Sequence, residues 1–500
     1  MKINKGEVLT AQQLMADPLF AGIPPKFLLW QEGLAVRLRT KPGDVLCREG
    51  EPGNTAFLIK SGRVVITVKK EPNLRIERGP EDFIVGEMAC LSGKPRTAQI
   101  SVIEAGEIWE IRRNVLDRLM RSPAQRERFD RIYRRHALDV VLRETRLFQV
   151  LSEPDYKRCA DFLREKLTFI RVSPGRPIFA QGDSSHHFFF VRLGHVSVEI
   201  KKRGRAPNLI YRGPGTAIGE IGLLALSPSD AGRTPDEVEA GVIAALNDPT
   251  MPPTAALPSG QRTATCTALD HVELARVDRA DFLGLLKTFP VLRRRLIELA
   301  LERLRQDDDD RPAMRQYMEQ GLYQGQSLLV LDLNKCTRCD ECTRACRDQH
   351  GTQSHGIPIT RLLRQGLHFG NFLVATSCRS CADAYCMIGC PVDAIHRGKH
   401  QQIVIEDHCI GCGLCANNCP FGNIAMIPNE RDKMQRPDPD HPGKTELVAQ
   451  MKASTCDLCD ADGEREVPKP RCVHACPHDA AHRMSGGELF REITGRSSER

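Results

Sequence analysis

The stretch Cys409–Pro420 reads CIGCGLCANNCP and places four cysteines within eleven residues. It is one of four such groups, which together hold sixteen of the chain's 20 cysteines. The groups are Cys336, Cys339, Cys342 and Cys346; Cys378, Cys381, Cys386 and Cys390; Cys409, Cys412, Cys415 and Cys419; and Cys456, Cys459, Cys472 and Cys476. Thiols grouped this closely are typical of metal-binding loops.

The spacing within the groups favours iron–sulfur clusters. The first and third groups have the C-x2-C-x2-C-x3-C spacing of bacterial ferredoxins, in which three thiolates hold one cluster and the fourth ligates its neighbour. Structural zinc sites use cysteines in separated pairs, and four compact groups would crowd single ions. Disulfides are disfavoured because the N-terminus has no apolar leader that would direct export to an oxidising compartment. We therefore predict four 4Fe-4S clusters and a cytoplasmic protein.

Length and composition limit the remaining functions. A chain of 500 residues is long enough for about three domains. It contains no run of about 18 apolar residues, so we expect no membrane span. Lys and Arg number 71 against 64 Asp and Glu, an excess that is a weak indication of nucleic-acid binding and is compatible with a small anionic ligand.

Two N-terminal stretches repeat the same order of parts, which indicates a duplicated domain. The matching pieces are Lys41–Gly50, Ala56–Val68 and Val85–Gln99 in the first repeat, and Ser173–Gly182, Phe188–Ile200, Ile218–Leu226 and Gly260–Ala268 in the second. Apolar and polar residues alternate in VVITV and VSVEI, and glycines separate the runs. Each repeat is therefore predicted to form a jelly-roll-like β-barrel, or β-roll.

Helical sequence follows each barrel. Leucine and isoleucine recur at three-to-four spacing in Asn114–Thr145 and Ala280–Gln306, and Pro290 divides the second segment into two helices. The insertion at about Ser227–Ser259 is rich in Pro, Ala, Asp and Thr, which predicts a mobile surface loop. The acidic run Asp307–Asp310 reads as a linker. These features predict a multidomain α+β protein with domains at 1–145, 146–310 and 311–500.

Both repeats resemble cyclic-nucleotide-binding domains, the family of the catabolite activator protein and of the regulatory subunits of cyclic-AMP-dependent kinase. The diagnostic cassette is Gly-Glu, a short helix and Arg-(Ser/Thr/Ala)-Ala, matched in the first repeat by Gly86, Glu87, Arg96, Thr97 and Ala98. The resemblance implies that Arg96 binds the cyclic phosphate, Glu87 the ribose 2′-hydroxyl and Thr97 acts as a supporting donor. A helix N-terminus and an arginine fork both suit an anion.

The second repeat keeps the same cassette in interrupted form. Its residues are Gly219, Glu220, Arg262, Thr263 and Ala264. Glu220 and Arg262 are 42 positions apart, whereas Glu87 and Arg96 are nine apart. An insertion need not move the ends of a loop, so we expect the second domain to bind ligand as well. The choice between cyclic AMP and cyclic GMP stays open.

The region from Gly325 to about Met484 resembles the four-cluster ferredoxin-type electron-transfer subunits of molybdopterin oxidoreductases. That family pairs the first group with the fourth and the second with the third. The resemblance therefore implies four ligand sets, each with one cysteine from the partner group. The sets are Cys336, Cys339, Cys342 and Cys476; Cys456, Cys459, Cys472 and Cys346; Cys378, Cys381, Cys386 and Cys419; and Cys409, Cys412, Cys415 and Cys390.

These features predict an electron-transfer component of an oxidoreductase that is regulated by cyclic AMP or cyclic GMP. We expect a redox partner protein, such as a catalytic oxidoreductase subunit, and no catalytic residues in this chain, because a series of clusters carries electrons without substrate chemistry. Two alternatives stay open. The chain could be a signalling protein with sensing clusters, or the barrels could be docking scaffolds. No helix-turn-helix follows the barrels, so we expect no nucleic-acid partner.

Overall fold

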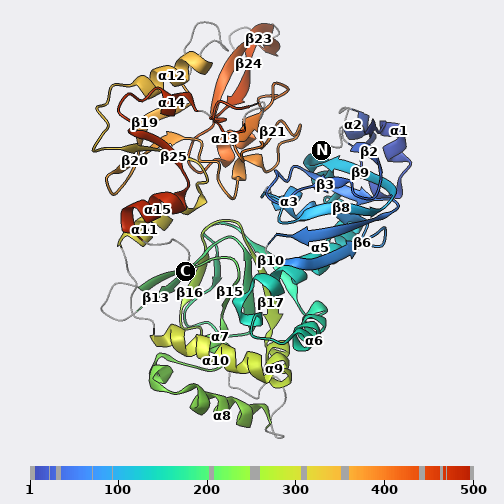
Figure 1. Ribbon diagram of the computed structural model, residues 1–500, viewed down its shortest axis with the longest axis vertical. Helices are drawn as coiled ribbons and strands as arrows, with labels where there is room; N and C mark the ends of the chain where they lie inside the picture. The colour runs from blue at the N-terminus through green and yellow to red at the C-terminus, as the bar shows by residue number, and fades with distance from the viewer. Residues whose placement is uncertain are drawn as a thin grey trace. The chain divides into compact units, whose positions relative to one another are not determined.

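A computed structural model describes residues 6–21, 23–29, 35–69, 71–92, 94–201, 208–247, 260–305, 312–350, 360–437, 445–461, 466–468 and 470–495. The chain divides into two compact units, one formed by Met1–Phe129 with Gln316–Arg500 and the other by Asp130–Arg315 (Figure 1). Within the described ranges, no helix has the length and apolar character needed to cross a membrane.

The first repeat forms two antiparallel sheets. The strand orders are β1(Glu7–Val8)-β2(Ala35–Thr40)-β9(Gly106–Arg112)-β4(Thr55–Ile59)-β7(Ile84–Val85) and β3(Val45–Cys47)-β8(Gln99–Glu104)-β5(Arg63–Val68)-β6(Glu71–Arg78). Inward-facing side chains of both sheets, including Leu38, Phe57, Val64 and Ile100, form a buried core. The alternation noted in VVITV thus places one face of each strand against the opposite sheet.

The second repeat has the same topology. Its strand orders are β10(Thr168–Val172)-β17(Val272–Asp278)-β12(His187–Leu193)-β15(Thr216–Ile218) and β11(Pro177–Phe179)-β16(Thr265–Ala268)-β13(Val196–Ile200)-β14(Asn208–Arg212). Strand for strand, these orders repeat β2-β9-β4-β7 and β3-β8-β5-β6. The prediction of two β-roll domains is therefore confirmed.

Helices connect and flank the barrels. They include α3(Glu87–Ser92) within the first cassette, α4(Arg113–Leu119) and α5(Pro123–Glu144) after it, and α6(Glu153–Arg164), α7(Glu220–Leu223), α9(Arg279–Thr288) and α10(Pro290–Arg305) farther along the chain. Pro290 is the first residue of α10. A backbone N–H at this position has no partner within the helix, so proline removes no helical hydrogen bond. Leu292, Leu296 and Leu301 of α10 are buried in the main core of the second unit.

The insertion in the second repeat is partly helical, which corrects the prediction of a mobile loop. Residues Pro228–Gly232 form the 3-10 helix η3, and Pro235–Leu246 form α8. Thr234 and Glu237 make a capping box at the start of α8, and Val238 and Val242 are buried in the same core as α10. The composition masked these local signals, a helix cap and an apolar stripe. Residues 248–259 lie outside the described residues, as does the predicted linker Asp307–Asp310.

The cysteine-rich region is built from short strands and helices. A four-stranded sheet has the order β19(Leu362–Phe369)-β20(Phe372–Ser377)-β18(Leu328–Asp332)-β25(Ala481–Met484), beside the hairpins β21(Ile395–Arg397)-β22(Ile403–Ile405) and β23(Ala425–Pro437)-β24(Thr445–Ser454). The helices are α11(Pro312–Glu319), α12(Glu341–His350), α13(Leu414–Asn418), α14(Arg471–His474) and α15(Gly486–Thr494).

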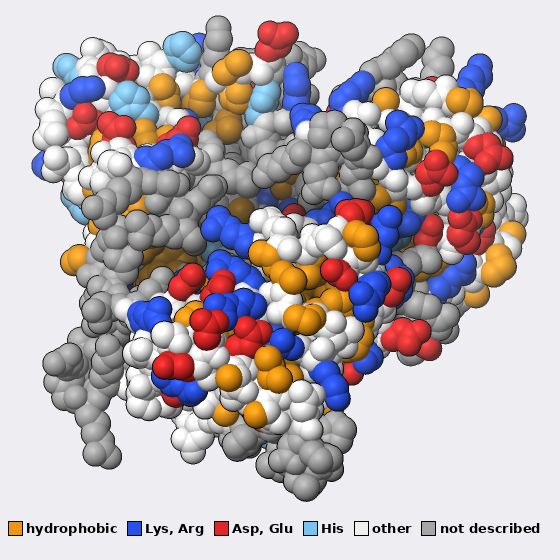
Figure 2. Space-filling view, turned by 60° about the horizontal axis from the view of Figure 1, so that its bottom comes forward, with side chains coloured by type: hydrophobic (Ala, Val, Ile, Leu, Met, Phe, Trp, Pro, Cys, Tyr) orange, Lys and Arg blue, Asp and Glu red, His pale blue; other side chains and the backbone are white. Residues whose placement is uncertain are grey.

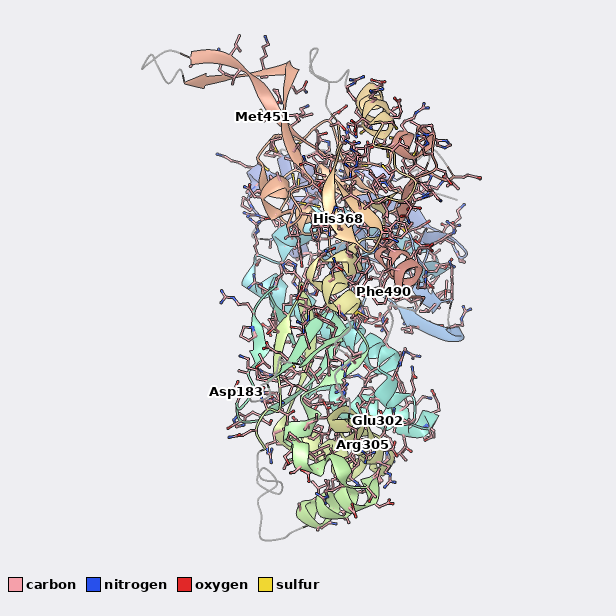
Figure 3. The ribbon with its side chains drawn as sticks, turned by 90° about the vertical axis from the view of Figure 1, so that its left-hand side faces the viewer. Asp183, Glu302, Arg305, His368, Met451 and Phe490 are labelled. Atoms are coloured by element: carbon pink, nitrogen blue, oxygen red, sulfur yellow. The ribbon has the colours of Figure 1, made fainter. Side chains whose placement is uncertain are left out.

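Aromatic packing holds the terminal helices of this region to its sheet. Tyr317 of α11 lies 4.8 Å, ring centroid to centroid, from Phe490 of α15, and Phe490 stacks on Phe369 at 6.3 Å. The carbonyl oxygen of His368 accepts hydrogen bonds from two glutamine side chains at the end of α11. Figure 3 labels His368 and Phe490 at this contact, and Met451 on the projecting β23–β24 hairpin.

Charged side chains are interspersed on the surface. Figure 2 shows Lys and Arg next to Asp and Glu over the face it presents, in keeping with the mild net charge of the sequence. A mixed surface of this kind is ordinary for a folded protein and is a weak indication of nucleic-acid binding.

Candidate cluster-binding and nucleotide-binding sites

The fold brings together the cysteines that the family resemblance assigns to each set. Cys336, Cys339 and Cys342 line one cavity with Cys476, which is 134 positions from Cys342. Burial raises the pKa of the Cys386 thiol well above its ordinary value, and the neighbouring Cys378, Cys381 and Cys419 raise it further. Two of the four predicted ligand sets are thus assembled around common centres.

The other two sets assemble in the same way. Burial raises the pKa of Cys415 to about 11, and Cys409, Cys390 and Cys412 add to the shift.

For Cys472, burial raises the pKa to about 12, with Cys456, Cys346 and Cys459 acting in the same direction and Arg483 opposing them. Four cysteines this close together, three of them buried and Cys459 half-buried, are stable together as thiolates only beside a cationic centre. This donor set fits an iron–sulfur cluster.

All four cysteine loops share one backbone feature. The residue before the second cysteine lies in the left-handed region, with φ of 63° at Arg338, 49° at Ser380, 69° at Gly411 and 58° at Leu458. Non-glycine residues adopt this conformation uncommonly, and only one of the four is glycine. The four groups therefore share this turn although the residues between their cysteines differ. The cysteine spacing indicates the similarity, whereas the residue types between the cysteines do not.

Backbone N–H groups donate to sulfurs of the fourth cysteines. The N–H of Asn423 lies 3.3 Å from Cys419 Sγ, and that of Ala480 lies 3.3 Å from Cys476 Sγ. In each case the donor is four residues beyond the cysteine, after a Cys-Pro turn. Cys346 accepts from the N–H of Arg361 at 3.3 Å. Such N–H···S bonds stabilise the reduced, more negative form of a cluster.

Arg483 joins two of the sets. Its buried guanidinium donates to Cys456 Sγ at 3.2 Å and to the carbonyl oxygen of Cys378 at 3.2 Å. Burial alone would lower the pKa of Arg483, but the thiols of Cys456, Cys472 and Cys378 outweigh burial and raise it. A fixed positive charge thus lies between the fourth and second groups.

His350 is a further polar neighbour of a cluster cysteine. Its Nε2 lies 3.5 Å from Cys459 Sγ, and Asp457 completes a close group with these two side chains. Burial lowers the pKa of His350 to about 4, Arg361 adds to this effect and Asp457 opposes it. Sequence reasoning missed both His350 and Arg483, because each is distant in sequence from the cysteine that it contacts.

The first nucleotide cassette is built around a buried arginine. Arg96 is 5% exposed and donates from Nη1 to the carbonyl oxygen of Gly86 at 2.8 Å and from Nη2 to Oγ1 of Thr55 at 3.1 Å. Gly86 has φ of 75°, and a Cβ there would lie 2.8 Å from Arg96 Nη1. Glycine at this position therefore permits both the turn and the approach of the arginine.

The other residues of the first cassette surround this arginine. Glu87 is buried and begins α3, Thr97 is exposed beside Arg96, and Ala98 is half-buried before β8. The helix start, the arginine and the exposed hydroxyl are thus close together in the first barrel, as the cassette requires.

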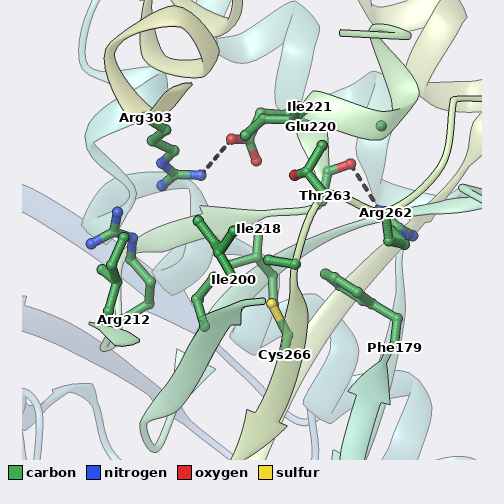
Figure 4. A pocket seen from close by; sticks show the side chains of 15 residues that line it. Phe179, Ile200, Arg212, Ile218, Glu220, Ile221, Arg262, Thr263, Cys266 and Arg303 are labelled. Carbon is green, nitrogen blue, oxygen red and sulfur yellow. Dashed lines mark hydrogen bonds and ion pairs between the residues drawn. The ribbon is translucent and has the colours of Figure 1, made fainter. Parts of the chain in front are cut away.

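The second cassette lines a pocket despite its interruption. Gly219, Glu220, Arg262, Thr263 and Ala264 all contribute to the wall (Figure 4). Gly219 has φ of 92° and caps α7, and Arg262 donates to the carbonyl oxygens of Gly219 at 2.9 Å and His187 at 2.7 Å. The two ends of the insertion therefore bring the cassette together across 42 positions.

Basic side chains dominate the charge of this pocket. Arg212, Arg262 and Arg303 line it beside the single carboxylate of Glu220. Arg303, from α10, donates to Glu220 Oε1 at 2.7 Å and to the carbonyl oxygen of Ala217 at 2.8 Å (Figure 4). Burial lowers the pKa of Arg212 to about 10, and Arg303 lowers it further. The pocket is electropositive and suits an anionic ligand.

Each cassette arginine has one side-chain N–H without a hydrogen-bond acceptor among the described residues, which we call its reserve donor. The Nε of Arg96 and the Nε of Arg262 are buried and meet no hydrogen-bond acceptor among the described residues. Arg262 also lies 4.1 Å from the ring centroid of Phe179, and Arg96 lies 5.3 Å from that of Phe57. A buried guanidinium donor without an acceptor is what a phosphate oxygen would satisfy.

Two family models match the chain. The cyclic nucleotide-binding domain matches residues 37–122 and 169–245, and the 4Fe-4S dicluster domain matches residues 408–480. The first model matches parts of both barrels. Its matches begin within β2 of the first barrel and within β10 of the second. The second covers the third and fourth cysteine groups.

Curated relatives are iron–sulfur and electron-transport proteins. The "Iron-sulfur protein" of Rhodospirillum rubrum is 31% identical over 169 residues, which are 31% of this chain and 79% of that protein. "Hydrogenase-4 component A" of Escherichia coli (strain K12) is 31% identical over 32% of this chain and 82% of its own length. "Electron transport protein HydN" of the same strain is 34% identical over 30% of this chain and 84% of its own.

Parts of the chain are also similar to solved structures. The regulatory domain of Toxoplasma gondii PKA with cAMP is 18% identical, with 59% of this chain and 94% of that chain covered and a TM-score of 0.24. Thermus thermophilus Catabolite Activator Protein is 23% identical, with 35% of this chain and 67% of that chain covered and a TM-score of 0.23. The domain assignment rests on the family model and on the matching strand orders of the two barrels.

Proposed function

Since the chain belongs to the family of ferredoxin-type iron–sulfur electron-transport proteins and joins that module to cyclic-nucleotide-binding domains, we propose that it carries electrons through four 4Fe-4S clusters under the control of a bound cyclic nucleotide. The observation that carries the proposal is the convergence of sixteen cysteines into four sets. The clusters would supply one-electron transfer, and the protein would position them and set their potentials.

The contacts between sets support an order of electron flow. In the proposed ligand sets, the first and fourth groups exchange a cysteine and the second and third groups do the same, and Arg483 hydrogen-bonds to both the fourth and the second group. Cys339 of the first group and Cys412 of the third are exposed, whereas Cys378, Cys456 and Cys472 are buried. We therefore propose the path first, fourth, second, third group, with partner proteins docking near Cys339 and near Cys412.

The redox partner is proposed to be a catalytic oxidoreductase subunit. Relatives include a hydrogenase component and the arsenate respiratory reductase iron-sulfur subunit of a Shewanella species, and such names support a role as the electron-carrying part of a larger enzyme. We place this activity in the cytoplasm, because assembly of clusters on free thiols requires a reducing compartment. The alternative of a signalling protein with sensing clusters is not favoured, since the relatives are electron carriers.

Regulation would act through either cassette. In this proposal Arg96 and Arg262 bind the cyclic phosphate, with Thr97 and Thr263 as neighbouring donors, and Glu87 and Glu220 accept from the ribose. The reserve Nε donors of both arginines and the basic second pocket support an anionic ligand of this class. Cyclic AMP and cyclic GMP differ only in the base, so competition between the two would identify the ligand.

Anaerobic reconstitution tests the proposal. The loaded protein should contain about sixteen irons and as many sulfides per chain, as four cubane clusters require. It should also bind cyclic nucleotide at up to two sites and reduce or oxidise a partner protein. A markedly lower iron count together with bound zinc would sink the cluster assignment. Full iron loading without nucleotide binding would instead support barrels that serve only as docking scaffolds.

A further inference from the structure

We propose that the first barrel reports its bound nucleotide to the second cysteine group by direct contact, between the barrel loop Gly50–Thr55 and the turn Arg397–Gln401. This inference rests on the proposed function, because it takes the first cassette as a nucleotide site and the second group as a cluster site. Both partners of the contact belong to the same compact unit, Met1–Phe129 with Gln316–Arg500.

Side-chain amides hold the loop to the turn. Asn54 donates from Nδ2 to the carbonyl oxygen of Arg397 at 2.9 Å and accepts at Oδ1 from the N–H of Arg397 at 3.4 Å. Gln401 donates from Nε2 to the carbonyl oxygen of Gly50 at 3.0 Å. Because each of these bonds joins a side chain to main chain, a shift of the loop displaces the backbone of the turn.

Residues of the same loop are hydrogen-bonded to Arg96 of the first nucleotide cassette. The N–H of Gly50 bonds to the carbonyl oxygen of Arg96 at 2.8 Å, and the N–H of Arg96 bonds to that of Glu51 at 2.8 Å. Thr55 accepts from Arg96 Nη2 and donates to Glu110 at 2.7 Å. Thr55 is thus bonded to the guanidinium whose Nε would meet the phosphate, so a shift of Arg96 on ligand binding would act directly on the loop.

At the other end of the contact, Arg397 reaches the second cysteine group. Its side chain is 1% exposed, and Nη2 donates to the carbonyl oxygens of Cys381 at 2.5 Å and Ala382 at 3.1 Å. Nη1 donates to the carbonyl oxygen of Gln401 at 3.2 Å, which ties the guanidinium to the turn. Charge and hydrogen bonding around ligating sulfurs set the reduction potential of a cluster, so movement of Arg397 changes that potential.

Coupling between two sites is reciprocal in binding free energy. If nucleotide shifts the potential of the second cluster, reduction of that cluster changes nucleotide affinity by the same factor. A tenfold change in affinity corresponds to about 59 mV for one electron. The affinity ratio between the oxidised and reduced protein and the shift in cluster potential on nucleotide binding are measured independently. They must therefore give the same coupling free energy.

The experiment uses the full-length, reconstituted protein with Arg262→Lys, so that a fluorescent cyclic nucleotide reports on the first cassette. Lysine keeps the charge at this position but lacks the fork-shaped contact to phosphate. Affinity is measured with the clusters oxidised and after reduction by dithionite. We expect an affinity ratio of at least about threefold, with a matching shift in the midpoint of one cluster signal in electron paramagnetic resonance.

Asn54→Ala in this background should bring the ratio to one while the affinity of the oxidised protein changes less than about twofold. His186→Ala is the matched control, because His186 is exposed and occupies the position of the second barrel that corresponds to Asn54. This control should keep the parent ratio. If Asn54→Ala does not fold, Gln401→Ala removes the other amide contact and should lower the ratio in the same direction.

The outcomes separate this inference from the function on which it rests. A parent protein that binds nucleotide with a ratio of one overturns the contact as a signalling route and leaves the regulated electron carrier intact. A ratio that survives in both Asn54→Ala and Gln401→Ala overturns it as well. A fully loaded protein that binds no nucleotide at all contradicts the proposed regulation itself, and the inference with it.

Discussion

The two nucleotide cassettes hold their arginines by similar hydrogen bonds. The cassettes differ in which part of the protein each one contacts. Arg96 and Arg262 each donate to the carbonyl oxygen of the cassette glycine and to a residue of the adjacent strand. In the second barrel, the cassette glutamate pairs with Arg303 of the barrel's own C-terminal helix. In the first, the cassette loop contacts a turn of the iron–sulfur module. The two barrels therefore share one arginine geometry but connect it to different parts of the protein, and we propose that they would signal by different routes.

Arg303→Ala breaks the feature that distinguishes the second cassette. Glu220 is 1% exposed, and removal of its partner leaves a buried carboxylate without that ion pair. We expect the second unit to lose about 3 kcal/mol of unfolding free energy, measured by calorimetry. Arg295→Ala on the same helix removes only surface ion pairs and should cost less than about 1 kcal/mol. Equal losses in the two variants would contradict the role of the Arg303 pair.

Arg96→Lys and Arg262→Lys test the feature that the cassettes share. Each substitution removes fork-shaped hydrogen bonds to phosphate, which are worth about 2 kcal/mol, and should weaken its own site about 30-fold. Isothermal titration should show two sites in the parent protein and one tight site in either variant. Two unchanged sites in Arg262→Lys would mean that the interrupted cassette does not bind nucleotide.

Val238→Ala tests whether the insertion is part of the second barrel's unit. The side chain of Val238 is 2% exposed in the core that α8 shares with α10. We expect a loss of about 1.5 kcal/mol, since two buried methyl groups are removed. Ile243→Ala on the same helix, where the side chain is 36% exposed, should cost less than about 0.5 kcal/mol. A mobile insertion would show no difference between the two variants.

Asp393→Asn gives the smallest expected effect and tests the contact of the first barrel. Burial raises the pKa of Asp393 to about 6, opposed by Arg112, His396 and Arg113 and reinforced by Asp117. Because its folded pKa lies above the ordinary value of 3.8, the contribution of Asp393 to stability falls as pH rises toward and through 6. The unfolding temperature of the wild type should therefore drop relative to Asp393→Asn between pH 5 and pH 7.

Asparagine suits this position, because Asp393 has φ of 55° and asparagine tolerates the left-handed region. Asp407→Asn, at an exposed carboxylate of the same module, is the control and should show no such pH-dependent difference. A constant difference between wild type and Asp393→Asn across this range would contradict the burial of Asp393 beside Arg112 and Arg113 of the first barrel.

The repeats, the cysteine groups and the cassettes could be predicted from the sequence because their signals are local. A C-x2-C loop needs only its own residues to aim two sulfurs at one centre, and Gly-Glu before a short helix marks an anion site within a few positions. The composition of the insertion predicts a mobile loop, whereas its described part, Ser227–Asn247, contains a capping box at Thr234 and two buried valines in α8. The helix is stabilised by packing on α10, which composition does not record.

The sequence by itself determined the sixteen cysteines, the order of the two barrels and the residues of both cassettes, since each of these follows from spacing along the chain. Only the tertiary structure decided which distant side chains modify them. Arg483 reaches Cys456, Arg397 reaches Cys381 and Arg303 reaches Glu220. In each case the contact joins residues from different elements, and buried charges are placed by packing and hydrogen bonding across elements, where no sequence periodicity applies.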